Sequence, residues 1–168
     1  MRNARGFTLI EMLTATAVAA TIATAAVPSM TNALSRQTLG STVTELLMAI
    51  DLGRGEAIAS GSRIVLAPTE GRDWSSGWQL YRDLNDNGVR DGDEPIVREF
   101  QRPDARVTFE AHGVLSTATM SFEEQGFIRR AGSNGLMLGR LNVRLDGQIR
   151  TLCFAAARVR VVVGTDCT

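Results

Sequence analysis

The chain has 168 residues and is 44% hydrophobic, which is enough for one domain with a core plus an additional element. Acidic and basic residues balance at 18 each, so the net charge gives no overall argument for a nucleic-acid partner. The charges are unevenly spread, however. Residues 70–124 hold twelve acidic residues against six arginines, whereas residues 125–168 hold seven arginines against two aspartates. A basic segment therefore ends a chain whose remainder is acidic.

The N-terminus combines a basic leader, residues 1–6, with an apolar stretch, residues 7–27. As a helix this stretch spans about 32 Å, which is one membrane crossing, and the leader arginines favour the cytoplasmic side. A secretory signal is cut after its apolar stretch, but here Gly6 precedes it. Glu11 lies inside it, where a charge costs about 2.5–3.5 kcal/mol and needs a partner. A signal anchor that tolerates Glu11 is the alternative, and it leaves Gly6 unexplained.

The run Gly6-Phe7-Thr8-Leu9-Ile10-Glu11 resembles the processing motif of type IV pilins and pseudopilins. The resemblance implies that a prepilin peptidase cuts between Gly6 and Phe7 and methylates Phe7. It also implies that other pilins pack against the N-terminal helix, and that Glu11 neutralises an N-terminal amine during assembly, as opposite charges attract strongly in a low dielectric. Pro28 matches the kink of the family near the membrane exit; a simple helix end is the alternative.

Two further patterns predict an α+β fold. Apolar residues recur at helical spacing after Pro28, although glycines at 40, 53 and 55 weaken the pattern, and the helix is expected to stop by Gly61. The residues of this stripe are Leu39, Val43, Leu46, Leu47, Ile50, Ala57 and Ile58. From residue 62 onward, short β-type runs alternate with turn residues, at 63–66, 78–81, 96–100, 107–110, 119–122, 136–145, 148–154 and 158–163. Asp146-Gly147 predicts a two-residue hairpin.

The region 74–98 resembles the body of the GspH/FimT group of minor pilins, through Trp74-Ser-Ser-Gly-Trp78, the Asp/Asn/Gly run 83–94 and Ile96-Val-Arg98. That group includes the H pseudopilin of type II secretion and a minor pilin of type IV pili. The resemblance implies a type IV pilin fold: a leader (1–6), a transmembrane helix (7–28), its amphipathic continuation (29–61) and an antiparallel β-rich head (62–168). It also implies a single-pass inner-membrane protein with a periplasmic head and a non-enzymatic role.

The first candidate site fits the EF-hand loop pattern, with Asp83, Asn85, Asn87, Gly88, Asp91 and Glu94 in place. Its side-chain oxygens, from Asp83, Asn85, Asn87, Asp91 and Glu94, could bind calcium. The flanking runs read as strands rather than as a helix pair, however. A turn-rich connector, in which Asn, Asp and Gly serve the backbone geometry, is therefore the alternative.

The second candidate site is the basic C-terminal segment, which contains Arg140, Arg144, Arg150, Arg158 and Arg160. On a strand, Arg158 and Arg160 share one face and can contact successive phosphates of double-stranded DNA. FimT-type minor pilins have a Gly-Arg-x-Arg motif here that is implicated in DNA uptake, and this chain resembles it except that Ala157 replaces the glycine. A basic edge strand that resists edge pairing is the alternative. Cys153 and Cys167 bracket Arg158 and Arg160, and export makes a disulfide between them the expectation; two unpaired small core residues are the alternative.

Catalysis finds no support in the sequence. His112 is the only histidine and no nucleophile grouping surrounds it, and Glu123 and Glu124 would point to opposite faces of a strand. Three functions remain open. One is a type IV pilus minor pilin that contacts DNA, and another is a type II secretion pseudopilin that contacts only other pseudopilins. The third is a purely structural minor pilin with no ligand.

Overall fold

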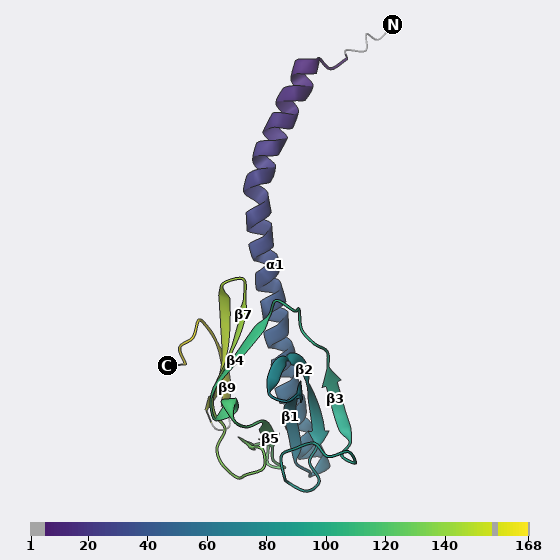
Figure 1. Cartoon of the computed structure of the whole chain (residues 1–168), viewed down its shortest axis with the longest axis vertical. Helices are drawn as coiled ribbons and strands as arrows, with labels where there is room; N and C mark the ends of the chain where they lie inside the picture. The colour runs from purple at the N-terminus through teal and green to yellow at the C-terminus, as the bar shows by residue number, and fades with distance from the viewer. Residues whose placement is uncertain (1–5, 156–157, 168) are drawn as a thin grey trace. The chain divides into compact units, whose positions relative to one another are not determined.

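The computed structural model describes residues 6–155 and 158–167, and of residues 25–28 it describes only the helical backbone, so the side chain of Pro28 lies outside the described set. The elements, most of which are labelled in Figure 1, are α1 (Leu9–Ser60), β1 (Ile64–Glu70), β2 (Asp73–Arg82), β3 (Ile96–Phe100), β4 (Thr108–Gly113), the 3-10 helix η1 (Val114–Ser116), β5 (Met120–Phe122), β6 (Ile128–Arg130), β7 (Leu138–Leu145), β8 (Gln148–Ala155) and β9 (Arg158–Val163). The chain forms two compact units, Met1–Ser35 and Arg36–Thr168.

The first unit contains the N-terminal part of α1, which presents apolar side chains on all its sides. Large exposed ones are Phe7, Leu9, Ile10, Met12, Leu13, Val18 and Ile22. The hydroxyls of Thr14, Thr16 and Thr21 donate to carbonyls three and four residues back, at 2.8–3.0 Å, so their polar atoms are satisfied within the helix. α1 is long and apolar enough to cross a membrane. A helix that is hydrophobic all round suits a lipid environment.

The second unit is built from the C-terminal part of α1 and two antiparallel sheets. One sheet has the strand order β3-β2-β1-β5-β6 and the other β4-β7-β8-β9. Leu39, Leu46 and Ile50 of α1 are almost completely buried, in one cluster with side chains of both sheets such as Trp78 and Leu152. All buried hydrophobic side chains of the described chain belong to residues 39–154. The fragment 36–168 therefore retains the whole core and can be studied as a folded unit.

The helix differs from its predicted stripe at two positions and continues through its glycines. Ala49 is fully buried although the stripe omitted it, and Ile58, predicted to be buried, is 56% exposed. A methyl group at Gly53 would lie 2.6 Å from the Phe122 ring and 2.8 Å from Leu80, so glycine allows α1 to approach the first sheet closely. Packing compensates for the low helix propensity of glycine at this position.

Each predicted run falls on a strand, but β1 extends four residues past its predicted end, β2 begins five residues before its predicted start, and one strand was not predicted. β3 and β9 have the predicted bounds, and the hairpin prediction is confirmed, as Leu145 pairs with Gln148 across Asp146 and Gly147, which both have positive φ. β6 was not predicted. It pairs with β5 through only three residues, too few to show an alternation.

Candidate functional site

At its N-terminus α1 is closed by a capping box, formed by two residues of the processing motif. The backbone N–H and the hydroxyl of Thr8 donate to Glu11 Oε2 at 3.1 and 3.2 Å, and the Glu11 N–H donates to Thr8 Oγ1 at 3.3 Å. Each side chain thus satisfies the backbone of the other. Thr8-x-x-Glu11 is a recognisable capping sequence, so this role of Thr8 could have been predicted. Glu11 is exposed, and its hydrogen-bond partner Thr8 is the residue after Phe7 in the same chain.

Four of the five candidate arginines lie on one face of the second sheet. Leu141, Val143 and Leu145 of β7 point into the core, so the alternating residues Arg140 and Arg144 lie on the opposite, outer face. Strand pairing places the others: Arg140 pairs with Cys153, which pairs with Arg160, and Arg158 pairs with Ala155. We call the set Arg140, Arg144, Arg158 and Arg160 the basic face. Its members come from two strands that are not neighbours, with β8 between them.

Arg150 does not belong to the basic face. It pairs with Val143 on one side and Val163 on the other, so it lies on the face that contains the core residues and is half-buried. The sequence proposed Arg150 as a DNA contact together with the other four, and the structure places it on a different face from them. The cause is the register across the hairpin. Even-numbered residues of β7 pair with odd-numbered residues of β8, so even-numbered Arg150 falls on the face opposite Arg140 and Arg144.

The four arginines differ in how freely they can meet a ligand. Arg158 and Arg160 are exposed, and Arg158 has no hydrogen bond or ion pair within the described residues. Arg144 donates to Glu110 Oε2 at 2.9 Å, and this bond holds the pKa of Glu110 below its ordinary value. Arg140 is half-buried. Arg158 and Arg160 are thus the two most available cations of the face.

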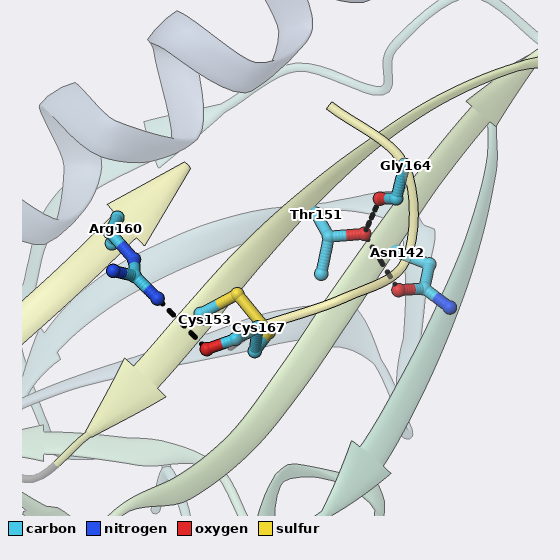
Figure 2. Close-up of a disulfide and its surroundings, with 6 residues drawn as sticks. All are labelled: Asn142, Thr151, Cys153, Arg160, Gly164 and Cys167. Atoms are coloured by element: carbon cyan, nitrogen blue, oxygen red, sulfur yellow. Dashed lines mark hydrogen bonds between the residues drawn. A yellow bond between two sulfur atoms is a disulfide. The ribbon is translucent and has the colours of Figure 1, made fainter. Parts of the chain in front are cut away.

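A disulfide joins the C-terminal tail to the middle of this face. Cys153 and Cys167 are bonded, with Cα atoms 5.7 Å apart, which confirms the expected pairing. Figure 2 shows Arg160 Nη2 donating to the Cys167 carbonyl at 2.8 Å. Thr151 Oγ1 lies 2.5 Å from the Gly164 carbonyl oxygen and 2.9 Å from Asn142 Oδ1. The tail is therefore fixed at both ends of its turn, and it positions Arg160.

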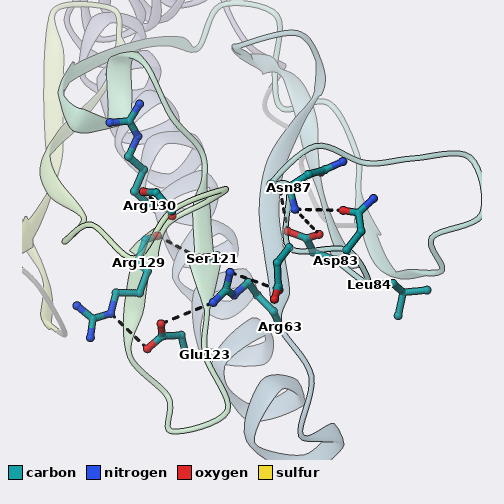
Figure 3. Close-up of polar contacts among 12 residues, drawn as sticks. Arg63, Asp83, Leu84, Asn87, Ser121, Glu123, Arg129 and Arg130 are labelled. Atoms are coloured by element: carbon teal, nitrogen blue, oxygen red, sulfur yellow. Dashed lines mark hydrogen bonds and ion pairs between the residues drawn. The ribbon is translucent and has the colours of Figure 1, made fainter.

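The candidate calcium loop connects β2 and β3, as the flanking pattern indicated, and is closed by its own hydrogen bonds. The buried Asp83 carboxylate accepts the N–H groups of Asn87 and Gly88 at 3.2 and 2.8 Å, and Figure 3 shows the bond with Asn87. The buried Glu94 carboxylate accepts the N–H groups of Leu84 and Asp91. Asp91 Oδ2 accepts the side-chain amides of Asn85 and Asn87 at 2.7 and 2.9 Å.

Within the described residues, no group of three or more His, Cys, Asp and Glu side chains is arranged to hold a metal ion. The bonds just described make the loop a self-closed connector. Calcium binding there remains a prediction from the sequence pattern.

Comparison with known proteins shows which family has this fold and N-terminal motif. The family model described as type II transport protein GspH matches residues 42–166, and the model of the prokaryotic N-terminal methylation motif matches residues 1–27. The chain belongs to the GspH family. No curated protein matches it significantly. Among solved structures, the type IV minor pilin FimU of Pseudomonas aeruginosa (strain PAO1) has a TM-score of 0.57 at 16% identity, over 79% of this chain and 97% of that one.

This GspH-family chain accordingly has the type IV pilin fold, a long N-terminal helix packed on antiparallel sheets, and a minor pilin or pseudopilin role. The GspH family consists of structural pilins and pseudopilins. His112 Nε2 lies 3.4 Å from Glu110 Oε1 and 3.2 Å from Asn142 Nδ2, beside Arg140 in the register, with no serine, threonine or cysteine nucleophile bonded to it among the described residues.

Proposed function

We propose that the chain is a minor pilin of a type IV pilus, assembled into the filament or its tip, whose head contacts double-stranded DNA through the basic face. The observation that carries the proposal is the exposure of Arg158 and Arg160 on one face, beside a tail held by a disulfide. Two residues apart on a strand, their Cα atoms are about 6.6 Å apart, which suits contact with successive phosphates. No base-reading helix or loop accompanies them within residues 6–155 and 158–167, so the contact would be independent of sequence.

Assembly would follow from the N-terminus. Cleavage after Gly6 would make Phe7 the first residue, and its amine would lie next to the Thr8 N–H that Glu11 already binds. Glu11 would then exchange its own helix cap for the amine of a neighbouring pilin, helped by the low dielectric of the bilayer. The exposed apolar side chains of the first unit would pack against other pilin helices or lipid.

A second candidate function is that of a minor pseudopilin of a type II secretion system, with no nucleic-acid role. The description of the matching family model, type II transport protein GspH, favours it. In that case the basic face would be a protected edge, because β9 ends its sheet and charged side chains discourage pairing with other strands.

DNA binding by residues 36–168 separates the two candidates. We expect the fragment to bind a short duplex at low salt in an anisotropy assay, and the variant Arg158→Gln/Arg160→Gln to bind about tenfold or more weakly, since each charge-assisted contact contributes on the order of 1 kcal/mol. The slope of log affinity against log salt should become shallower by about two, one for each lost phosphate contact.

The matched control is Arg98→Gln/Arg102→Gln, which removes the same charge from exposed positions on and after β3 in the other sheet. It should keep most of the affinity. Absence of binding by the wild-type fragment at low salt would reject the DNA proposal and leave the secretion candidate. Equal losses of DNA affinity in both double variants would show that binding depends on net charge and not on the basic face.

A further inference from the structure

A cavity of about 540 Å³ lies on the outer surface of the first sheet, away from the basic face. Its floor is formed by Ala67, Gln79 and Tyr81, which share one face because Ala67 pairs with Gln79 and Val65 pairs with Tyr81. The alternating residues Leu66 and Leu80 face the core. The walls come from loop residues 87–90, from 117–119 and from 130–131. Five separate segments of the chain thus line it.

The charged residues that line this cavity are all arginines: Arg72, Arg90 and Arg130. The residues that line it all belong to the described part of the chain, and none is Asp or Glu. Arg72 Nη1 has one long hydrogen bond, 3.5 Å, to the Ser116 carbonyl. The guanidinium groups of Arg90 and Arg130 have no hydrogen bond or ion pair to described residues. Three exposed cations therefore border one hollow with no carboxylate to neutralise them.

Other arginines near the cavity have a carboxylate partner. Arg63 and Arg129 both meet the carboxylate of Glu123, at 3.8 and 3.2 Å, and Arg82 meets Glu56 at 3.4 Å. Figure 3 shows the guanidinium of Arg130 pointing away from this Glu123 cluster, although Arg130 is the next residue after Arg129. Among the described residues of this region, Arg63, Arg82, Arg106 and Arg129 have ion pairs, whereas the three arginines of the cavity, like the exposed Arg98 and Arg102, have none.

The wall that carries Arg90 is held rigidly. Gly88 has φ +75° and packs so closely on the next wall that a methyl group there would lie 2.3 Å from the Gly132 nitrogen. The Tyr81 hydroxyl donates to the Gly88 carbonyl at 3.2 Å. The carboxylates of Asp83 and Glu94 are bound by loop N–H groups and do not line the cavity. The cavity is thus largely formed before any ligand arrives, which lowers the ordering cost of binding.

We propose that this cavity is a binding site for a phosphate-bearing ligand of about nucleotide size. A single guanidinium can donate to both oxygens of one carboxylate, whereas three guanidinium groups from separate segments match the several oxygens of a phosphate ester. The volume lies within the range of small-molecule sites and exceeds that of a lone phosphate. Gln79 on the floor adds a donor and an acceptor for the remainder of the ligand. The site is independent of the basic face and does not require the DNA proposal to hold.

The test is an amide-resolved NMR titration of residues 36–168 with inorganic phosphate, with a deoxynucleoside monophosphate, and with a short DNA duplex. We expect saturable shifts of the Gly88, Thr119 and Ala131 amides with the mononucleotide, and shifts at higher concentration with inorganic phosphate. If the duplex moves these amides and the mononucleotide does not, the phosphates belong to a polynucleotide; the reverse assigns a small ligand. The second result supports the proposal, and the first overturns a ligand of nucleotide size.

The variant Arg90→Gln/Arg130→Gln should bind at least tenfold more weakly, and its exposed side chains make loss of folding unexpected, which a melting curve checks. In the variant Arg158→Gln/Arg160→Gln the mononucleotide should shift these three amides as it does in the wild type, which separates this site from the basic face. The proposal is overturned if no probe shifts the three amides, if the Arg90/Arg130 variant retains the wild-type affinity, or if a glutamate-rich peptide binds as tightly as the mononucleotide.

Discussion

Removal of the Cys153–Cys167 disulfide is expected to lower the free energy of unfolding of residues 36–168 by about 3 kcal/mol. The bond closes a loop between residues 14 positions apart, and its main effect is to restrict the unfolded chain. Cys153 is buried in the middle of β8, so the variant Cys153→Ala/Cys167→Ala avoids burying an unpaired polar group. Urea unfolding followed by circular dichroism measures the difference.

The reduced wild-type protein is the matched control, because it lacks the bond but keeps every side chain. It should lose about as much stability as the alanine variant. A difference between the two would measure the loss of the sulfur atoms from the packing. Oxidised and reduced forms with the same unfolding midpoint would contradict the assignment of a stabilising disulfide.

The second large effect is expected at Gly88. A non-glycine residue at φ +75° is strained by about 1–2 kcal/mol, and the added methyl group would collide with the backbone of Ala131 and Gly132, which cannot move as a flexible side chain can. We therefore expect Gly88→Ala to destabilise residues 36–168 by about 3 kcal/mol, measured as a change in the urea midpoint at an unchanged slope.

Gly147→Ala is the control for this effect. Gly147 has nearly the same φ, +79°, but a methyl group there would meet no atom within 4 Å. It should cost about 1 kcal/mol, from the backbone strain alone. Equal losses at the two positions would show that the contact between Gly88 and Gly132 does not constrain the loop. A glycine required by this contact also explains position 88 without a metal ion.

The sequence predicted the fold well where a pattern was long enough to show a period. β9 alternates Arg and Val over its first four residues, and its bounds were predicted correctly, whereas three-residue β6 has no readable period. Ile58 lies in register with the apolar stripe but near the end of α1, where it is 56% exposed. Periodicity assigns a residue to a side of the helix, but it does not show how far along the helix the sheets extend.

The candidate site was predictable within a strand and not between strands. The spacing of Arg158 and Arg160 alone places them on one face. Whether Arg140 or Arg150 joins them depends on the register of β7, β8 and β9, which a single sequence does not show. The ion pair of Arg144 with Glu110, 34 residues away, and the three arginines that line the cavity depend in the same way on strand pairing and loop packing.

The mass of the mature chain tests the pilin assignment most directly. Intact-mass spectrometry of the protein extracted from the inner membrane of a cell with a prepilin peptidase should show a chain that lacks residues 1–6 and carries one methyl group on Phe7. The variant Gly6→Ala, whose added methyl group would meet no described atom within 4 Å, should keep the leader without disturbing the fold. A wild-type chain that retains residues 1–6, or is cut after the apolar stretch, would contradict processing as a pilin.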